Sequence, residues 1–258
     1  MKRIIITMVA VWLAVMAVLL FSDTVRTRYW GWRLARAEAP AEQDYYASRL
    51  ARRADHAVSV AGKLLGHADP NVRLLAVEVM DQASGDEPID PLFTGLTDEE
   101  VEIRHAAALA LGRRANPDVI GRLSQMASGG DATVATAAVF ALQRAAIPPA
   151  EDAIIHVLET TDSIEVRAQA IESLGLLGVE RARPVLTRML QDSRRVTTMP
   201  ANERAMWRGF LAQRHRLGPP ALAVTQLAPE GGKTIRDYAA EALRQLRRAS
   251  TTASHPAS

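Results

Sequence analysis

The residues best suited to chemistry include a Gly-Gly-Lys-Thr run at residues 231–234. Glycine followed by lysine and threonine is typical of a phosphate-binding loop, in which backbone N–H groups and the lysine hold the phosphate. That loop also requires a glycine five residues before Gly232, and position 227 is leucine. The run follows a predicted helix, whereas a phosphate-binding loop follows a strand. We therefore predict no phosphate site here.

A second candidate is the set Asp152, His156 and Glu159, which share one face of a predicted helix through their spacing of four and three residues. One imidazole and two acids can touch a metal ion, but such a set is more often an ordinary polar helix face. The chain has no cysteine, which excludes thiolate metal sites, disulfides and cysteine nucleophiles. No HExxH motif, Gly-x-Ser-x-Gly elbow or Ser-His-Asp set occurs. The sequence therefore predicts no catalytic residue, no cofactor and no metal.

One pattern recurs beyond residue 54 and indicates which elements position a functional surface. An aliphatic residue and an arginine are followed by two residues, an alanine, and then further small residues, often with leucine. The arginine-equivalent positions are 73, 104, 135, 167, 204 and 236, separated by 31, 31, 32, 37 and 32 residues. A regular period in this range indicates stacked units of supersecondary structure. The clearest copies contain Arg73, Arg104, Arg167 and Arg236, whereas position 135 is alanine.

A second, shorter apolar segment with helical spacing precedes each copy. These segments are residues 58–65, 89–96, 119–126, 154–158, 184–190 and 221–227. Asp69 and Asp131 lie three residues before the aliphatic position, where a carboxylate can cap the first turn of a helix. The sequence thus predicts an all-α domain of six helical pairs across residues 55–248.

These pairs resemble HEAT repeats, in particular the bacterial HEAT-like class with an Asp/Glu–Val–Arg–Ala signature. The resemblance implies an α-solenoid of about six hairpins whose surfaces bind other macromolecules. The recurrent arginines are then interpreted as structural residues that lie along the stack and pair with acids or carbonyl groups. HEAT-type iron hydroxylases carry repeated His-Glu pairs, and the nearest equivalent here, Arg104-His105-Ala106, has alanine in the acidic position. HEAT-like bilin lyases share the repeat signature, so a lyase-like enzyme or enzyme subunit handling a small-molecule ligand stays an alternative.

The N-terminal sequence predicts a membrane anchor. After a short basic tail, residues 1–3, the uncharged residues 4–21 predict a transmembrane helix of about 27 Å, near the lower limit for spanning a bilayer. No small-x-small cleavage site lies just after residue 21, so we favour an uncleaved single-pass anchor over a cleaved signal peptide. We expect a bacterial inner membrane, and the flanking charges leave the side of the remaining chain open.

Residues 22–41 are predicted to be a juxtamembrane linker, and residues 42–54 a capping helix. Within the linker, Tyr29, Trp30 and Trp32 lie beside arginines, a combination that suits the headgroup level of a membrane. Residues 249–258 are rich in serine, threonine and alanine and are predicted to be a disordered tail.

The net charge of +2 hides an uneven distribution. Residues 71–180 contain 7 basic and 18 acidic side chains, whereas residues 181–248 contain 14 basic and 5 acidic ones. The 37-residue step predicts a short insertion within residues 191–202, and insertions in repeat proteins often lie on a binding face. Alternatively, Trp207 and Phe210 fill a wider gap between irregular repeats. The candidate partner-binding residues in this region are Arg194, Arg195, Arg204, Arg208 and Arg214.

Together these features predict a membrane-tethered scaffold or adaptor that mediates protein–protein interaction without catalysis of its own. The expected partner is an unidentified protein, and nucleic acid is not expected for a chain held at a membrane. The sequence leaves open the oligomeric state, and also whether the basic C-terminal segment contacts protein or anionic lipid.

Overall fold

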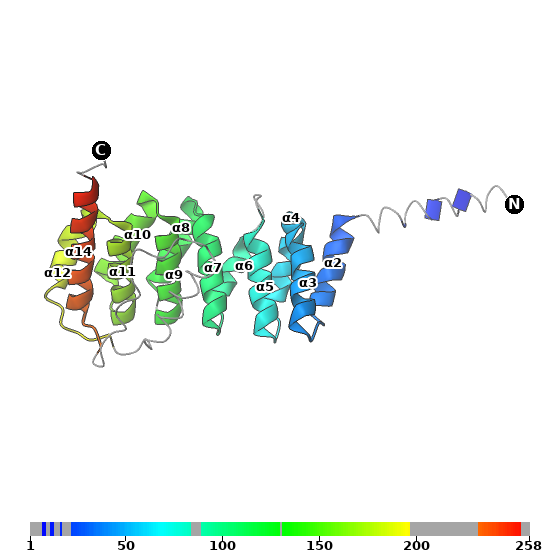
Figure 1. The fold of residues 1–258 in the computed structure, drawn as a ribbon, viewed down its shortest axis with the longest axis horizontal. Coiled ribbons are helices and arrows are strands. Elements are labelled where there is room, and N and C mark those ends of the chain that lie inside the picture. The colour runs from blue at the N-terminus through cyan, green and yellow to red at the C-terminus, as the bar shows by residue number, and fades with distance from the viewer. Residues whose placement is uncertain are drawn as a thin grey trace. The chain divides into compact units, whose positions relative to one another are not determined.

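The computed structural model describes residues 22–83, 89–129, 131–196 and 232–253, together with Thr7, Met8, Val11, Trp12 and Met16. Within these ranges the regular structure is helical, apart from one isolated β-bridge between Arg195 and Thr234. The described helices follow one another in pairs (Figure 1). The chain divides into two compact units, Met1–Ala107 and Ala108–Ser258, and the boundary lies inside helix α7 (Val101–Arg113).

The first unit contains the hairpins α2/α3 and α4/α5. Its helices are α2 (Asp23–Leu34), α3 (Pro40–Ala51), α4 (Ala54–Leu64), α5 (Pro70–Asp81), α6 (Asp90–Gly95) and the first part of α7. Helix α2 packs on α3 and α4, and α3 packs on α5, so the two hairpins stack on each other. Gly31 permits this close approach, because a Cβ atom at that position would collide with the side chain of Val60 in α4.

The structure differs from the predicted linker at residues 22–41. Most of this segment is helix α2, whose buried residues Thr27, Gly31 and Leu34 follow a helical spacing. Two of these three residues are small or polar, so their periodicity is weak in the sequence beside the tyrosine, tryptophan and arginine residues around them. The predicted capping helix at residues 42–54 overlaps α3, and α2 with α3 completes a first hairpin.

The second unit begins with the end of α7. It continues with α8 (Pro117–Ala127), α9 (Ala132–Ala145), α10 (Pro148–Thr160), α11 (Ile164–Leu177), a 3-10 helix (Glu180–Ala182), α12 (Arg183–Met189) and α14 (Ile235–Ala253). Helix α8 pairs with α9 and α10 with α11, and these hairpins stack through α8 on α10 and α9 on α11. Asp131 and Ser163 cap α9 and α11 by accepting backbone N–H groups of the first turn.

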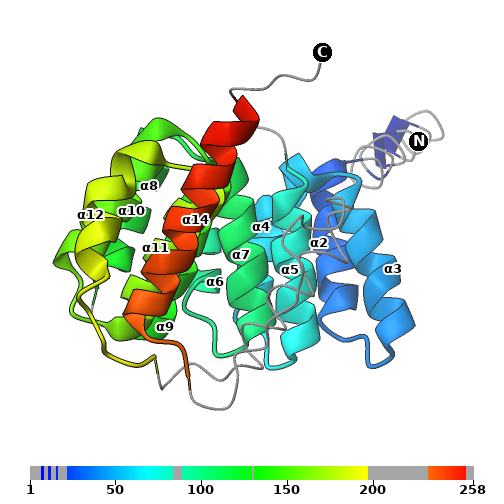
Figure 2. The same cartoon turned by 60° about the vertical axis from the view of Figure 1, so that its left-hand side comes forward.

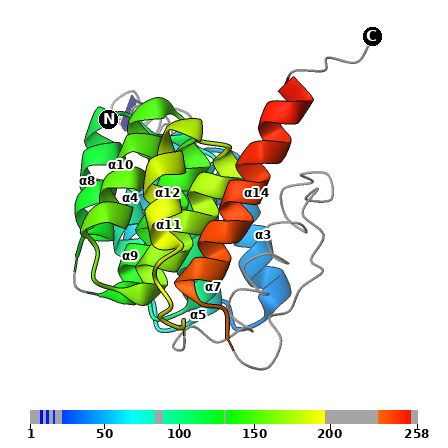
Figure 3. The same cartoon turned by 90° about the vertical axis from the view of Figure 1, so that its left-hand side faces the viewer.

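The last hairpin corrects the predicted order of the repeats. The sequence pattern pairs residues 184–190 with the copy at Arg204, and residues 221–227 with the copy at Arg236. In the structure, α12 pairs with α14, and α14 also packs on α11 (Figures 2 and 3). The inner helix of this hairpin therefore carries Arg236. Six pairs were predicted across residues 55–248, whereas the described helices make five pairs there and a further pair, α2/α3, before residue 55.

Small residues explain why α14 occupies this position. Ala239 and Ala242 are buried, and a Cβ atom on Gly175 of α11 would meet Ala242 at 2.8 Å. The copy at Arg204 has Trp207 and Phe210 at the positions that correspond to these two alanines. Two large aromatic side chains do not fit where helices approach so closely. A period alone could not distinguish the two copies, because both keep the arginine.

Residues 197–231, which lie outside the described residues, therefore interrupt the last hairpin. The chain on either side of them is joined by backbone hydrogen bonds: the Val196 N–H donates to the Lys233 carbonyl at 3.1 Å, and the Ile235 N–H donates to the Arg194 carbonyl at 3.0 Å. The step from Arg167 to its next equivalent in the stack, Arg236, is 69 residues. The insertion is thus much longer than the predicted one.

No helix of the described residues is both long and apolar enough to cross a bilayer. The predicted span, residues 4–21, lies outside those residues except at Thr7, Met8, Val11, Trp12 and Met16. The predicted disordered tail is corrected in part, because α14 continues to Ala253. No proline or glycine interrupts the helix before that point, whereas Pro256 follows soon after. Residues 254–258 lie outside the described residues.

Candidate functional site

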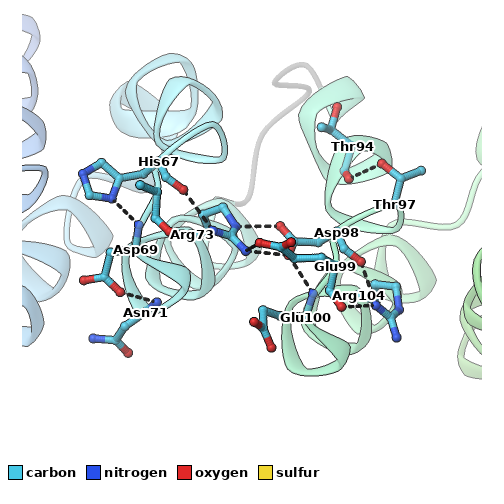
Figure 4. Close-up of polar contacts among 11 residues, drawn as sticks. His67, Asp69, Asn71, Arg73, Thr94, Thr97, Asp98, Glu99, Glu100 and Arg104 are labelled. Carbon is cyan, nitrogen blue, oxygen red and sulfur yellow. Dashed lines mark hydrogen bonds and ion pairs between the residues drawn. The ribbon is translucent and has the colours of Figure 1, made fainter.

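Arg73, at the start of α5, joins the loop before its own helix to the loop before α7 (Figure 4). Its Nη1 donates to the carbonyl oxygens of His67 and Ala68 at 3.0 and 3.1 Å. Its Nε and Nη2 donate to the Asp98 carboxylate at 2.8 and 2.9 Å. Only 6% of Arg73 is exposed, and its hydrogen bonds to Asp98 raise the pKa of the guanidinium. We call such a bond set, from one side chain to two successive loops, a loop tie.

Arg167 makes the same loop tie in the second unit. Its guanidinium donates to the carbonyl oxygen of Thr161 and, at 3.3 Å, to the carboxylate of Asp192. Asp192 follows Arg167 by 25 residues, as Asp98 follows Arg73. The acid that completes each tie therefore recurs with the arginine. Both side chains of the Arg167–Asp192 pair are largely buried, at 13% and 15% exposed.

The other two recurrent arginines bind the loop before their own helix. Arg104 Nη1 donates to the carbonyl oxygens of Asp98 and Glu99, each at 2.7 Å. Arg236 Nε donates to the Leu190 carbonyl oxygen at 2.9 Å, across the long insertion. This contact places Arg236 at the repeat position that the sequence pattern assigns to Arg204.

Gln43 makes the loop tie of the first hairpin, and the sequence pattern missed it. Its Nε2 donates to the Ala37 carbonyl oxygen at 3.0 Å and to the Asp69 carboxylate at 2.7 Å. Asp69 also caps α5 by accepting the Asn71 N–H at 2.9 Å. Burial alone would raise the pKa of Asp69, but the hydrogen bonds from Asn71 and Gln43 hold it below its ordinary value. Pro40 lies three residues before Gln43, as Pro70 lies three residues before Arg73, and this spacing could have identified the first hairpin as a repeat.

The series of loop ties is interrupted at Ala135 in α9. Its methyl group is fully buried and is too short to reach either loop. Elsewhere the recurrent arginines donate to carbonyl oxygens of their own chain, as described above for Arg73, Arg104, Arg167 and Arg236.

The predicted partner-binding arginines are only partly described. Arg194 Nη2 pairs with Asp192 at 2.6 Å, and the backbone of Arg195 forms the bridge with Thr234. Both side chains are exposed at the point where the insertion leaves the fold. Arg204, Arg208 and Arg214 lie outside the described residues. The structure therefore brings two of the five predicted residues together, beside the loop tie of Arg167.

The predicted interfacial aromatics separate into one inner and two outer residues. Trp30 is half-buried, with the Arg53 guanidinium 5.3 Å from the centre of its ring, and Arg53 pairs with Asp23 at 2.5 Å. Tyr29 and Trp32 are 52% and 51% exposed and stack on each other with ring centres 6.3 Å apart. Trp30 thus belongs to the packing of the hairpin, whereas Tyr29 and Trp32 remain accessible.

The outer residues form a surface that we call the outer aromatic face, consisting of Val25, Tyr29 and Trp32 of α2 and Tyr45 of α3. All four are more than a third exposed. By helical geometry they point away from the residues of α2 and α3 that are buried toward α4 and α5. Arginines cover its edges: Arg36 lies 4.6 Å from the Trp32 ring centre and Arg49 lies 5.1 Å from that of Tyr45. Such a surface binds apolar and anionic groups together.

The acid–histidine set in α10 is engaged in ion pairs. Asp152 pairs with Arg181 at 2.9 Å, and Glu159 pairs with Arg188 at 2.6 Å. In the part of the chain that the structure describes, no three histidine or acidic side chains are grouped closely enough to hold a metal ion.

Comparison with known proteins identifies the repeats. The family model of HEAT repeats matches residues 58–143 and 120–203. No curated protein matches the sequence.

The fold is also similar to solved structures at low identity. An engineered protein is 18% identical over 86% of this chain and 96% of its own, with a TM-score of 0.39. The Escherichia coli protein YibA is 17% identical over 90% of this chain and 84% of its own, with a TM-score of 0.40. Human deoxyhypusine hydroxylase is 21% identical over 83% of each chain, with a TM-score of 0.29.

Proposed function

The chain belongs to the HEAT-repeat family, and we propose that it is a membrane-tethered scaffold that binds another protein and has no catalysis of its own. Each unit of a repeat stack contacts only its neighbours, so the fold offers an extended surface to a partner. The observation that carries the proposal is the use of the repeat arginines. Arg73, Arg104 and Arg167 bind loops of their own chain, which leaves ligand binding to the outer surface.

The tether in this proposal is residues 4–21, as a single span in a bacterial inner membrane. Its support is the uncharged sequence and the position of the outer aromatic face close behind it in the chain. A soluble scaffold has no need to expose tyrosine and tryptophan beside arginine on its first hairpin, whereas these residues suit a membrane interface.

The partner in this proposal is a protein with an acidic surface, bound where the insertion leaves the fold. Arg194 and Arg195 are exposed there, and Arg244 is exposed on α14. Arg204, Arg208 and Arg214 belong to the inserted sequence itself. Complementary charge brings protein partners together and selects among them.

Crosslinking of the full chain in its native membrane tests this function. We expect one reproducible protein partner, and we expect its capture to be lost in the variants Arg194→Glu/Arg195→Glu and Arg204→Glu/Arg208→Glu. The matched control is Arg113→Glu/Arg122→Glu, which reverses two exposed arginines of α7 and α8. Equal capture by all variants would contradict the basic site. Purification of the chain with a bound small molecule, and with no partner protein, would contradict the scaffold and favour a lyase-like role.

A further inference from the structure

We propose that the outer aromatic face lies against an anionic lipid surface and fixes the first hairpin flat on the membrane. This inference rests on the proposed span at residues 4–21 and adds the partner of a defined surface. It replaces a loosely tethered scaffold with one whose first repeat is part of the membrane contact.

The chain between the proposed span and the first repeat is short. Ser22 is the single residue between residue 21 and the start of α2 at Asp23. Because a helix rises about 1.5 Å per residue, Trp32 lies within about 15 Å of Ser22. The first hairpin therefore has no flexible linker that could carry it away from the bilayer.

The direction of α2 also favours contact with the bilayer surface. Ser22 has an extended backbone, with φ −68° and ψ 125°, so α2 is not a straight continuation of a preceding helix. The headgroup region is only about 5–8 Å thick on each side of a bilayer. A helix standing upright would carry Trp32 beyond that layer, whereas a helix lying along the surface keeps Val25, Tyr29 and Trp32 within it.

The side chains of the outer aromatic face match the chemistry of an anionic lipid surface. The large apolar side chains Val25, Tyr29 and Trp32 follow one side of α2 with spacings of four and three residues. Arg28 and Arg36 are exposed beside them, while Asp23, the acid of this helix, is paired with Arg53. Tyrosine and tryptophan prefer the headgroup level, and arginine binds the phosphates of anionic lipids. A protein partner would satisfy the same residues but would not explain their position next to the span.

The test uses the absence of cysteine from the chain. A spin label on Val25→Cys reports the outer aromatic face, and a label on Gln82→Cys, exposed at the end of α5, is the matched control. The full chain is reconstituted into vesicles of phosphatidylcholine alone or with phosphatidylglycerol. We expect the label at position 25 to be shielded from a water-soluble nickel complex in the anionic vesicles, and the label at position 82 to stay accessible.

Charge reversal should remove this shielding. In Arg28→Glu/Arg36→Glu the ratio of docked to undocked hairpin should fall by about tenfold or more in anionic vesicles, because each arginine contributes to lipid attraction. Shielding that persists in this variant, or that is the same without anionic lipid, would overturn the proposed lipid charge requirement. Shielding that rises with protein density would instead show that a second copy covers the face.

Flotation and alkaline extraction of the same vesicles separate the two proposals. A chain that resists extraction but leaves position 25 accessible would overturn the lipid contact and keep the span. A chain that does not float with the vesicles would overturn the span, and the lipid contact with it.

Discussion

The first and the last described hairpins, α2/α3 and α12/α14, differ in what they expose. Four of the large apolar residues exposed between residues 22 and 253 belong to α2/α3, and in the described part of the chain none belongs to α12/α14. Helix α14 instead buries Ile235, Ala239, Ala242 and Leu246 and exposes arginines on its other side. Terminal repeats of a solenoid need a polar outer face for solubility. Hairpin α12/α14 meets that requirement, and α2/α3 does not.

The same two hairpins differ in how their loops are held. In the first hairpin the neutral amide of Gln43 reaches Asp69, whereas near the last hairpin the charged Arg167 reaches Asp192. In the first tie only the Asp69 carboxylate is charged, whereas the second tie joins two largely buried charges. The proposed lipid contact would account for the exposed apolar residues of α2/α3, whereas the described outer side of α14 carries arginines.

The largest expected effect separates the two kinds of loop tie. Asp192→Ala leaves the largely buried Arg167 without its carboxylate and should reduce the free energy of unfolding by about 3 kcal/mol. Asp69→Ala removes a helix cap and one bond from Gln43 and should cost about 1–2 kcal/mol. Urea unfolding followed by circular dichroism measures both. Equal losses would show that the charge of the tie is unimportant.

The next effect compares the helix contacts of the two hairpins. Gly31→Ala and Gly175→Ala each place a methyl group against a neighbouring helix and should destabilise by about 2 kcal/mol. Val60→Ala should restore most of the loss in Gly31→Ala, because it removes the side chain in the way. Gly121→Ala, which meets nothing within 4 Å, should be neutral or stabilising in the same melts. Destabilisation by Gly121→Ala would contradict this packing.

Excision of residues 197–231 tests whether α12/α14 is a hairpin in its own right. With Val196 joined to Gly232 through a two-glycine turn, the helical content of the remaining chain should be unchanged. Its stability should rise by about 1 kcal/mol, because a shorter connection costs less entropy to close. Thermal melts in detergent measure this. Loss of the helical signal of α14 would contradict its pairing with α12 and restore the predicted repeat order.

The smallest expected effect is a pH dependence of the folding stability, to which Asp69 at α5 and Asp237 at α14 both contribute. Hydrogen bonds from Thr234 lower the pKa of Asp237 at α14, and those from Asn71 and Gln43 lower the pKa of Asp69 at α5 despite its burial. A carboxylate with a lowered pKa stabilises the folded state above its unfolded value of about 4, and the stabilisation is lost as the pH falls through the folded value. Stability measured from pH 7 down to about pH 3 should therefore fall less in Asp69→Asn and in Asp237→Asn than in the unmodified chain. An identical slope would contradict the role of these caps.

The sequence predicted the repeat helices well where the signal is local. The caps at Asp69 and Asp131 and the helices that carry Arg73, Arg104 and Arg167 follow from residue types a few positions apart. The position of α14 beside α11 did not follow, because it depends on the contact between Gly175 and Ala242, far apart in the chain.

Two features of the candidate surfaces also could not be predicted from the repeat pattern of the sequence. The first hairpin has the amide Gln43 at the position of the recurrent arginine, so the arginine pattern did not identify this hairpin as a repeat. Tyr29 and Trp32 were predicted beside Trp30 as one group, and only the packing of α2 distinguishes the exposed residues from the one that packs beneath Arg53.

The interruption at Ala135 has a mechanical consequence. Along the first unit, Gln43 and Arg73 connect consecutive loops, so a pull on one loop is passed to the next through polar bonds. In the second unit the corresponding connection is missing at Ala135 and begins again with Arg167. There, α9 and α11 are held together by apolar packing and by the hydrogen bond that Ser173 Oγ donates to Gln143 Oε1 at 2.7 Å. We therefore expect the loop before α9 to yield before the loop that Arg167 binds when the second unit is stretched.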